Sequence, residues 1–255
     1  MSTPPRTLNE LFFGAMDRSA SRPVAMRVKR GGTWVGTSFA ELLSQVQAFS
    51  IGLHELGVNA GDRLAILSEN RPEWAVTDFA CLACRCADVP VYPTLPAHQI
   101  EYILRDSGAV AVCCSSAAQL GKILEIRGNL PALKTIVVFD ADAATGGAVT
   151  FESVLAKGRA AIPKYPTWRA DALAVKPDDL ATLIYTSGTT GDPKGVMLTH
   201  GNITSDVMAG LQVLDLRQSD ECLSFLPLSH IFERMAGHYC MTQQGAIINY
   251  ATSIE

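Results

Sequence analysis

The sequence lacks both the basic surplus of a nucleic-acid-binding protein and the long apolar runs of a membrane protein. Lysine and arginine total 21 against 25 aspartates and glutamates, so the formal net charge is −4. This balance indicates no nucleic-acid partner and no acidic tail. A membrane span takes roughly 20 mostly apolar residues, but Asp78, Arg85 and Asp88 interrupt the apolar region at 74–92, and amide side chains interrupt the uncharged run at 235–254.

Signals for secretion and for disulfide bonding are also missing. Asn9 and Glu10 stand where the apolar core of a secretory signal would lie. The seven cysteines are an odd number, and Cys81, Cys84 and Cys86 crowd into a short segment. This usage is typical of a reducing compartment. The sequence therefore predicts a cytoplasmic protein.

The composition, with 48% hydrophobic and 18% charged residues, excludes a disordered or fibrous chain. From residue 64 onward, short apolar segments alternate with amphipathic ones. Strands this short and uniformly apolar are buried on both faces, as in a parallel sheet covered by helices. We predict an α/β fold: a doubly wound, mainly parallel sheet with helices on both faces. The expected strands are 64–68, 89–92, 110–114 and 136–139, and the expected helices are 72–84, 98–106 and 118–127.

Local signals predict further elements before this sheet. Residues 7–18 have the apolar spacing of an amphipathic helix. A Gly-Gly pair predicts a tight turn in a hairpin at 24–36. Ser38 and Glu41 form a capping box, which predicts a helix that ends at Gly57.

A proline-containing segment at 161–179 is the best candidate for a domain boundary. We predict a first α/β subdomain at 1–170 and the start of a second at 171–255. The second has expected strands near 180–186, 195–199, 222–226 and 246–250, and expected helices near 201–213 and 231–243. It looks incomplete, because the sheet begins without an obvious closing element.

The strongest chemical signal is the segment 185–195, where an apolar strand runs into three glycines, several hydroxyls and Lys194. Glycines let the backbone approach an anion closely, and successive backbone amides bind it. Hydroxyls bond phosphate oxygens or Mg²⁺, and lysine adds a mobile positive charge. The segment is not a Walker A loop, because Lys194 precedes a glycine and a strand rather than opening a helix. The alternative is a flexible hairpin loop of small residues.

Four motifs in order resemble the AMP-forming acyl-CoA synthetases and other adenylate-forming enzymes. Tyr185 to Asn202 resembles the phosphate-binding signature of that family. Leu226 to Arg234, Ser68 to Trp74 and Val89 to Thr94 resemble motifs of its long-chain fatty acid–CoA ligases. The resemblance covers roughly residues 8–255, and several ordered motifs make a chance match improbable.

The resemblance implies ATP-dependent activation of a long-chain fatty acid. In that family the fatty carboxylate attacks the α-phosphorus of ATP, pyrophosphate leaves, and the CoA thiol then displaces AMP from the acyl-adenylate. It implies ATP, Mg²⁺, CoA and a fatty acid as partners, with peripheral membrane contact as a further expectation. The predicted phosphate-binding residues are Thr186, Ser187, Gly188, Thr189, Thr190, Gly191, Lys194 and Gly195; Thr186 is also the predicted metal ligand.

His230 is the predicted catalytic residue. It stands at the carboxyl end of a strand, where open α/β sheets bind ligands, and the resemblance implies that its motif lines the acyl and adenylate pocket. There it would position the carboxylate that attacks phosphorus. The alternative is a core or surface histidine satisfied by hydrogen bonds, and Glu233 and Arg234 are interpreted as a structural pair.

The chain departs from the family in two ways. Arg85 to Asp88 replaces a usual Gly-Ala turn, and the later motifs for adenine, ribose and the C-terminal domain are not found. We expect an amino-terminal fragment that is inactive by itself. The alternatives are a non-catalytic nucleotide- or acyl-binding module, another carboxylic acid–CoA ligase, and a thiol redox protein using Cys81 and Cys84, although buried helix cysteines are the favoured interpretation of that pair.

Overall fold

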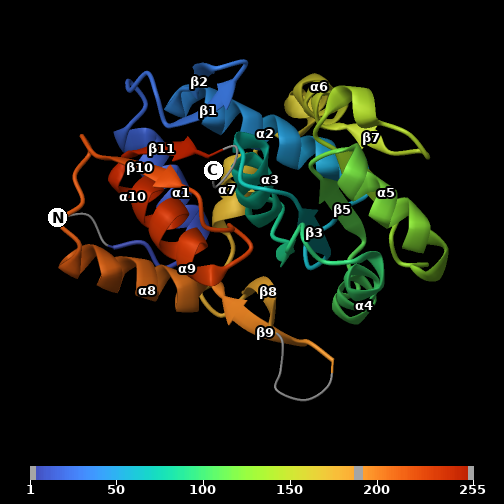
Figure 1. Ribbon diagram of the computed structural model, residues 1–255. Helices are drawn as coiled ribbons and strands as arrows, with labels where there is room; N and C mark the ends of the chain where they lie inside the picture. Colours follow the sequence, from blue (N-terminus) through green and yellow to red (C-terminus); the bar gives the residue numbers. More distant parts are fainter. Residues whose placement is uncertain (1–3, 187–191, 252–255) are drawn as a thin grey trace.

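The computed structural model describes residues 4–186 and 192–251 (Figure 1). The predicted N-terminal elements are confirmed: α1 (Leu8–Arg18), the hairpin of β1 (Met26–Arg30) and β2 (Thr33–Thr37), and α2 (Phe39–Glu55). The hairpin turns through two glycines with φ of 55° and 84°, a conformation that suits glycine. Helix α2 begins with the predicted capping box, in which Ser38 and Glu41 satisfy each other's backbone amides.

A seven-stranded sheet in the order β7-β6-β5-β3-β4-β8-β9 forms the centre of the molecule. All neighbouring pairs are parallel except β8 and β9, so the prediction of a mainly parallel sheet is confirmed. Its strands are β3 (Arg63–Leu67), β4 (Ala87–Val91), β5 (Ala111–Cys114), β6 (Thr135–Val138), β7 (Val149–Thr150), β8 (Leu180–Thr186) and β9 (Lys194–Thr199).

Helices cover both faces of this sheet, as predicted. Along β3, Leu64 and Ile66 join one hydrophobic cluster, and Ala65 and Leu67 join another. Because successive strand residues point to opposite faces, each cluster lies on its own face. The first cluster includes residues of α3 (Pro72–Ala83) and α6 (Phe151–Ala161), and the second includes residues of α4 (Ala97–Ser107) and α5 (Ala117–Ile126).

A second sheet contains four strands in the order β10-β11-β1-β2. Strand β11 (Ile247–Tyr250) runs parallel to β10 (Glu221–Ser224) on one side and parallel to β1 on the other. The hairpin near the beginning of the chain is therefore completed by strands from near its end.

Strands on either side of the predicted boundary at 161–179 pair in both sheets. Strands β8 and β9 extend the large sheet, while β10 and β11 join β1. The division into 1–170 and 171–255 stays a prediction about domains. The pairing itself ties the two segments together.

The remaining helices lie mainly in the second half of the chain. They are α7 (Trp168–Leu173), α8 (His200–Val213), α9 (Ile231–Glu233), a π-helical segment (Arg234–Cys240) and α10 (Met241–Gln244), with 3-10 turns at Arg127–Asn129, Ala141–Ala143 and Ile162–Lys164. The sequence predicted one helix at 231–243 but not its π-helical turn. Within residues 4–186 and 192–251, none of the helices has the length and apolar character that a membrane crossing requires.

Candidate functional site

The two strands that lead into and out of the predicted phosphate loop lie side by side (Figure 1). In the antiparallel pair of β8 and β9, Thr186 stands opposite Lys194, and both are exposed. A hydroxyl and an ammonium group therefore share one end of a two-stranded ribbon. The other predicted residues of the loop, Ser187, Gly188, Thr189, Thr190 and Gly191, lie outside the described residues.

Gly195 has a packing reason to be glycine. A Cβ at this position would lie 3.0 Å from Cζ of Tyr185, which is its cross-strand partner. The Tyr185 hydroxyl donates a hydrogen bond of 2.6 Å to Asp106 in α4, and burial together with this carboxylate raises the pKa of Tyr185. This hydrogen bond joins the β8–β9 pair to α4, one residue before the predicted phosphate-binding segment begins at Thr186. A role of Gly195 in phosphate binding stays a prediction.

His230 is exposed and is not a core histidine. It is the N-cap residue of α9, and its Nδ1 accepts a hydrogen bond of 3.2 Å from the backbone amide of Phe232. An Nδ1 that accepts leaves the proton of a neutral ring on Nε2. The imidazole is therefore held in one orientation, with its Nε2–H free of this capping bond. Its catalytic role stays a prediction.

A groove of about 700 Å³ lies between residues of the two motifs. Val196 and Leu198 of β9 line one side, and Ile231 and Met235, which follow His230, line another. Helix α8 supplies the remaining wall, which is partly polar: Asn202, Ile203, Ser205, Asp206 and Ala209. Residues next to the groove lining are exposed and apolar: Met197 is 65% and Phe232 is 56% accessible.

A wholly buried ionic cluster lies behind this site, and the sequence analysis did not find it. The guanidinium of Arg234 donates to Asp78 of α3 at 2.5 Å and to Asp88 of β4. It also donates to the hydroxyl of Thr182 in β8 at 2.9 Å and to that of Tyr239 at 3.0 Å. One side chain thus joins the helix that follows His230 to the strand that leads into the phosphate loop.

Two carboxylates share this one guanidinium, and their pKa values move apart. Burial disfavours both anions, but Arg234 and His238 outweigh it at Asp78 and lower its pKa to about 2. Burial and the Asp78 charge prevail at Asp88 and raise its pKa to about 7. Like charges that share a site separate in this way. The signal in the sequence was present: charges of both signs stand in otherwise apolar segments.

The described cysteines do not form the predicted alternative redox pair. Burial raises the pKa of the Cys81 thiol, and a hydrogen bond with Cys86 together with burial raises that of Cys84. A redox pair activated for exchange has a depressed thiolate pKa, so the favoured interpretation of helix cysteines agrees better with these environments. Within residues 4–186 and 192–251, no group of three or more His, Cys, Asp or Glu side chains is arranged to hold a metal ion.

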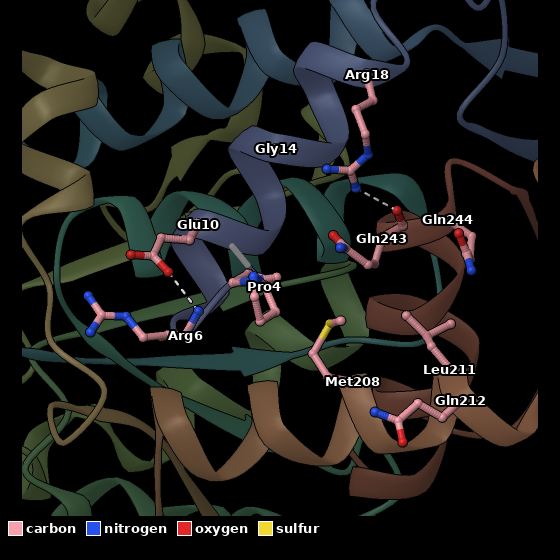
Figure 2. A pocket seen from close by; sticks show the side chains of 11 residues that line it. Pro4, Arg6, Glu10, Gly14, Arg18, Met208, Leu211, Gln212, Gln243 and Gln244 are labelled. Atoms are coloured by element: carbon pink, nitrogen blue, oxygen red, sulfur yellow. Dashed lines mark hydrogen bonds between the residues drawn. The ribbon is translucent and has the colours of Figure 1, made fainter. Parts of the chain in front are cut away.

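A larger groove of about 890 Å³ lies apart from these motifs (Figure 2). It runs between the N-terminal segment, α1, α8 and α10. Its lining includes the polar side chains of Arg6, Glu10, Arg18, Gln212, Gln243 and Gln244. On one side of the groove, Arg18 joins α1 to α10 by donating a hydrogen bond of 2.8 Å to the backbone oxygen of Gln243. The lining of this larger groove does not include Thr186, Lys194 or His230.

Comparisons with known proteins agree with the motifs and the fold. The family of AMP-binding enzymes matches residues 14–254. This chain belongs to that family. The long-chain fatty acid–CoA ligase FadD15 of Mycobacterium tuberculosis is 38% identical over 205 residues, covering 80% of this chain and 33% of the relative. The peroxisomal long chain acyl-CoA synthetase 7 of Arabidopsis thaliana is 35% identical over 249 residues, covering 89% of this chain and 33% of the relative.

A solved structure of the same fold is the anthranilate CoA ligase AuaEII in complex with anthranoyl-AMP. It has a TM-score of 0.80 and 23% identity, and the match covers 96% of this chain and 45% of that chain. This member of the AMP-binding enzyme family spans about a third of the length of the curated relatives.

Proposed function

We propose that this chain supplies the phosphate- and acyl-binding part of an ATP-dependent long-chain fatty acid–CoA ligase. The observation that carries the proposal is the groove bordered by both motifs, with β9 on one side and the residues after His230 on the other. The apolar side chains that β9 and the segment after His230 contribute to it suit an acyl chain, and the Thr186–Lys194 end of the ribbon suits a polyphosphate. The family membership and the named relatives support the same activity.

In the proposed reaction, the fatty carboxylate attacks the α-phosphorus of ATP, and pyrophosphate leaves. Lys194 neutralises charge on the β- and γ-phosphates, which is the kind of support that phosphoryl transfer requires. CoA then displaces AMP from the acyl-adenylate. His230, whose ring is oriented by its bond to the Phe232 amide, would donate from Nε2 to the carboxylate and hold it for attack.

The end of β8 offers one oxygen donor that fits Mg²⁺. Thr186 offers an exposed hydroxyl opposite Lys194, and Mg²⁺ accepts oxygen ligands from few protein groups, with substrate phosphates and water supplying the rest. When bound, the ion would neutralise phosphate charge. Thr186 would hold it through that hydroxyl.

We further propose a reducing, cytoplasmic location with peripheral membrane contact. All seven cysteines are free, which supports a reducing compartment. The exposed Phe232 follows the groove residue Ile231 and suits contact with a lipid surface that delivers the fatty acid. Co-sedimentation with phosphatidylcholine vesicles tests the contact, and Phe232→Ser should weaken it.

The activity is tested by ATP–pyrophosphate exchange in the gene product that carries this sequence. Palmitate should support exchange, whereas anthranilate should not. Exchange with an aryl acid alone would instead identify another carboxylic acid–CoA ligase. Binding of ATP or palmitate without any exchange would identify a non-catalytic module.

A further inference from the structure

The proposed function assigns no role to two of the four motifs, residues 68–74 and 89–94. Both lie at the carboxyl ends of neighbouring parallel strands: the first begins directly after β3, and the second contains the end of β4. Open α/β sheets bind ligands at this edge. Each motif also forms a hydrogen bond with the segment that leads to His230.

The side chain of Asn70 binds that segment through both ends of its carboxamide. Its Nδ2 donates a hydrogen bond of 2.6 Å to the carbonyl of Leu226, and its Oδ1 accepts one of 2.9 Å from the amide of Leu228. The same Nδ2 donates to the hydroxyl of Ser224, the last residue of β10, at 3.0 Å. A carboxamide donates and accepts at once, whereas an ionised aspartate only accepts. Asparagine therefore suits this position.

The residues on either side of Asn70 are themselves held on the large sheet. The carboxylate of Glu69 accepts a hydrogen bond from the hydroxyl of Ser115, which directly follows β5. Arg71 donates to the carbonyl of Ser115 at 3.2 Å and to the carboxylate of Asp140 at 3.0 Å. Asn70 therefore projects from a supported base, which is what a group that orients another group requires.

The segment that Asn70 binds ends in a turn that presents His230. The amide of His230 donates a hydrogen bond of 2.9 Å to the carbonyl of Pro227, and the two residues between them are buried. One of these, Ser229, donates from its hydroxyl to the carbonyl of Val91 at 3.2 Å. The first motif thus holds the start of the turn and the second holds its middle, while His230 itself is exposed.

We propose that Asn70 is a positioning residue, which fixes the turn at 227–230 so that the His230 imidazole meets the carboxylate of the fatty acid. This inference rests on the proposed function, in which His230 holds that carboxylate. Removal of the carboxamide frees the carbonyl of Leu226 and the amide of Leu228 from their side-chain partner. The turn, and the imidazole with it, then moves over a wider range.

Hydrogen–deuterium exchange of the intact chain tests the positioning without any substrate. In Asn70→Ala, peptides that cover 226–230 should exchange faster, because the amide of Leu228 has lost its acceptor, while peptides from α8 should not change. Asn70→Asp keeps an acceptor for that amide but no donor for Leu226, so its exchange should lie between the two. The aspartate variant decides if the alanine variant fails to fold.

Asn9→Ala is the matched control for these variants. Asn9 also donates two hydrogen bonds to backbone carbonyls, but those carbonyls belong to α3 and α7. Its loss should leave exchange at 226–230 unchanged. Unaltered exchange of that segment in both Asn70 variants, or an equal increase in Asn9→Ala, would overturn the proposal even if the chain did not act on fatty acids.

ATP–pyrophosphate exchange in the gene product that carries this sequence tests the effect on the reaction. Asn70→Ala should lower kcat/KM for palmitate by up to about 100-fold, since a displacement of about 1 Å can cost that much. The KM for ATP should stay unchanged. After His230→Ala, the further change Asn70→Ala should add little, because residues that act through one another are not additive.

The outcomes separate this inference from the proposed function. A normal rate in His230→Ala would refute the role proposed for His230, and with it the purpose of the positioning. A slow His230→Ala beside a normal Asn70→Ala would overturn the positioning role alone. So would fully additive losses in the double variant, or a KM for ATP that rises as much as that for palmitate.

Discussion

At the scale of single residues, a charge that we propose acts on ligands is exposed, whereas a charge that holds the fold is buried. Lys194 is exposed at the start of β9, whereas Arg234 is fully buried between the carboxylates of Asp78 and Asp88. The sequence could predict a role for the first, because lysine in a glycine-rich loop has a recognisable chemistry, and that role stays a prediction. It could not assign the second, because a buried ion cluster depends on partners that lie 146 and 156 residues away.

Lys194→Ala should slow adenylate formation more than thioester formation in the gene product that carries this sequence. In the proposed reaction the triphosphate is held only in the first half-reaction, and the loss of a charge-assisted contact costs about 1.5–3 kcal/mol. ATP–pyrophosphate exchange measures this step. Lys29→Ala removes the same charge from an exposed strand and should leave exchange unchanged; normal exchange in Lys194→Ala, with slow transfer from preformed acyl-adenylate to CoA, would contradict the assignment.

Arg234→Met should lower the free energy of unfolding by about 3–5 kcal/mol, because it leaves two buried carboxylates without their cation. Urea denaturation measures the change. Arg217→Met is the matched control, since Arg217 pairs with Asp215 on the surface, where its side chain is 69% exposed. An exposed pair contributes at most about 1 kcal/mol. Equal losses in the two variants would refute the assignment of Arg234 as the buried anchor.

At the scale of elements, helix ends explain why some predictions hold and others fall short. The capping box of α2 and the glycine after α4 are local signals, so both helix termini could be predicted from sequence. The π-helical segment Arg234–Cys240 has no comparable signal. Its first residue is the arginine of the buried cluster, so tertiary contacts rather than local propensity set its conformation.

Arg85→Gly should stabilise the end of α3. Arg85 has a φ of 59°, where a side chain costs roughly 1–2 kcal/mol, while glycine in the unfolded chain costs about 0.5–1 kcal/mol in entropy. The net gain should be about 0.5–1 kcal/mol, visible as a higher melting temperature. Arg105→Gly, inside α4, should instead destabilise, and a loss of stability in Arg85→Gly would show that its side chain makes a contact that outweighs the strain.

The contact between α1 and α8 should make stability depend on pH. Burial lowers the pKa of His200 to about 4, and its Nδ1 accepts from the amide of Leu8 at 3.3 Å. Between this value and an unfolded pKa of about 6.5, the unfolded chain binds more protons, so stability is present above that range and is lost as the pH falls through it. Taken by itself, His200 contributes a slope that approaches about 1.4 kcal/mol per pH unit.

His200→Gln tests this origin, because its amide oxygen can still accept from Leu8 but does not titrate. Between pH 4 and pH 7, the difference in unfolding free energy between the unaltered chain and the variant should follow that slope. Asp88 acts in the opposite sense, since its raised pKa makes stability fall as the pH rises toward about 7. An unchanged profile in His200→Gln would assign the dependence to other groups.

At the scale of the whole molecule, the order of elements was predictable but their assembly was not. Apolar periodicity indicated the alternating strands and helices of the large sheet, and the motifs indicated a family. Pairing between β1 and β11, more than 200 residues apart, leaves no local trace, so proline content alone suggested a boundary at 161–179. In both sheets, strands of the two segments lie side by side, with β4 next to β8 and β1 next to β11.

The last prediction follows from that pairing between segments: 1–170 and 171–255, expressed separately, should not fold cooperatively. The first piece loses the pairing of β4 with β8 and of β1 with β11, and it leaves Asp78 and Asp88 buried without Arg234. The second piece keeps only the pairs β8–β9 and β10–β11, which are too few strands for an independent core. Circular dichroism of each piece should show no sigmoidal melt, whereas mixing the two should restore one. A cooperative transition in 1–170 alone would show that the first subdomain is autonomous and that the boundary at 161–179 is a true domain boundary.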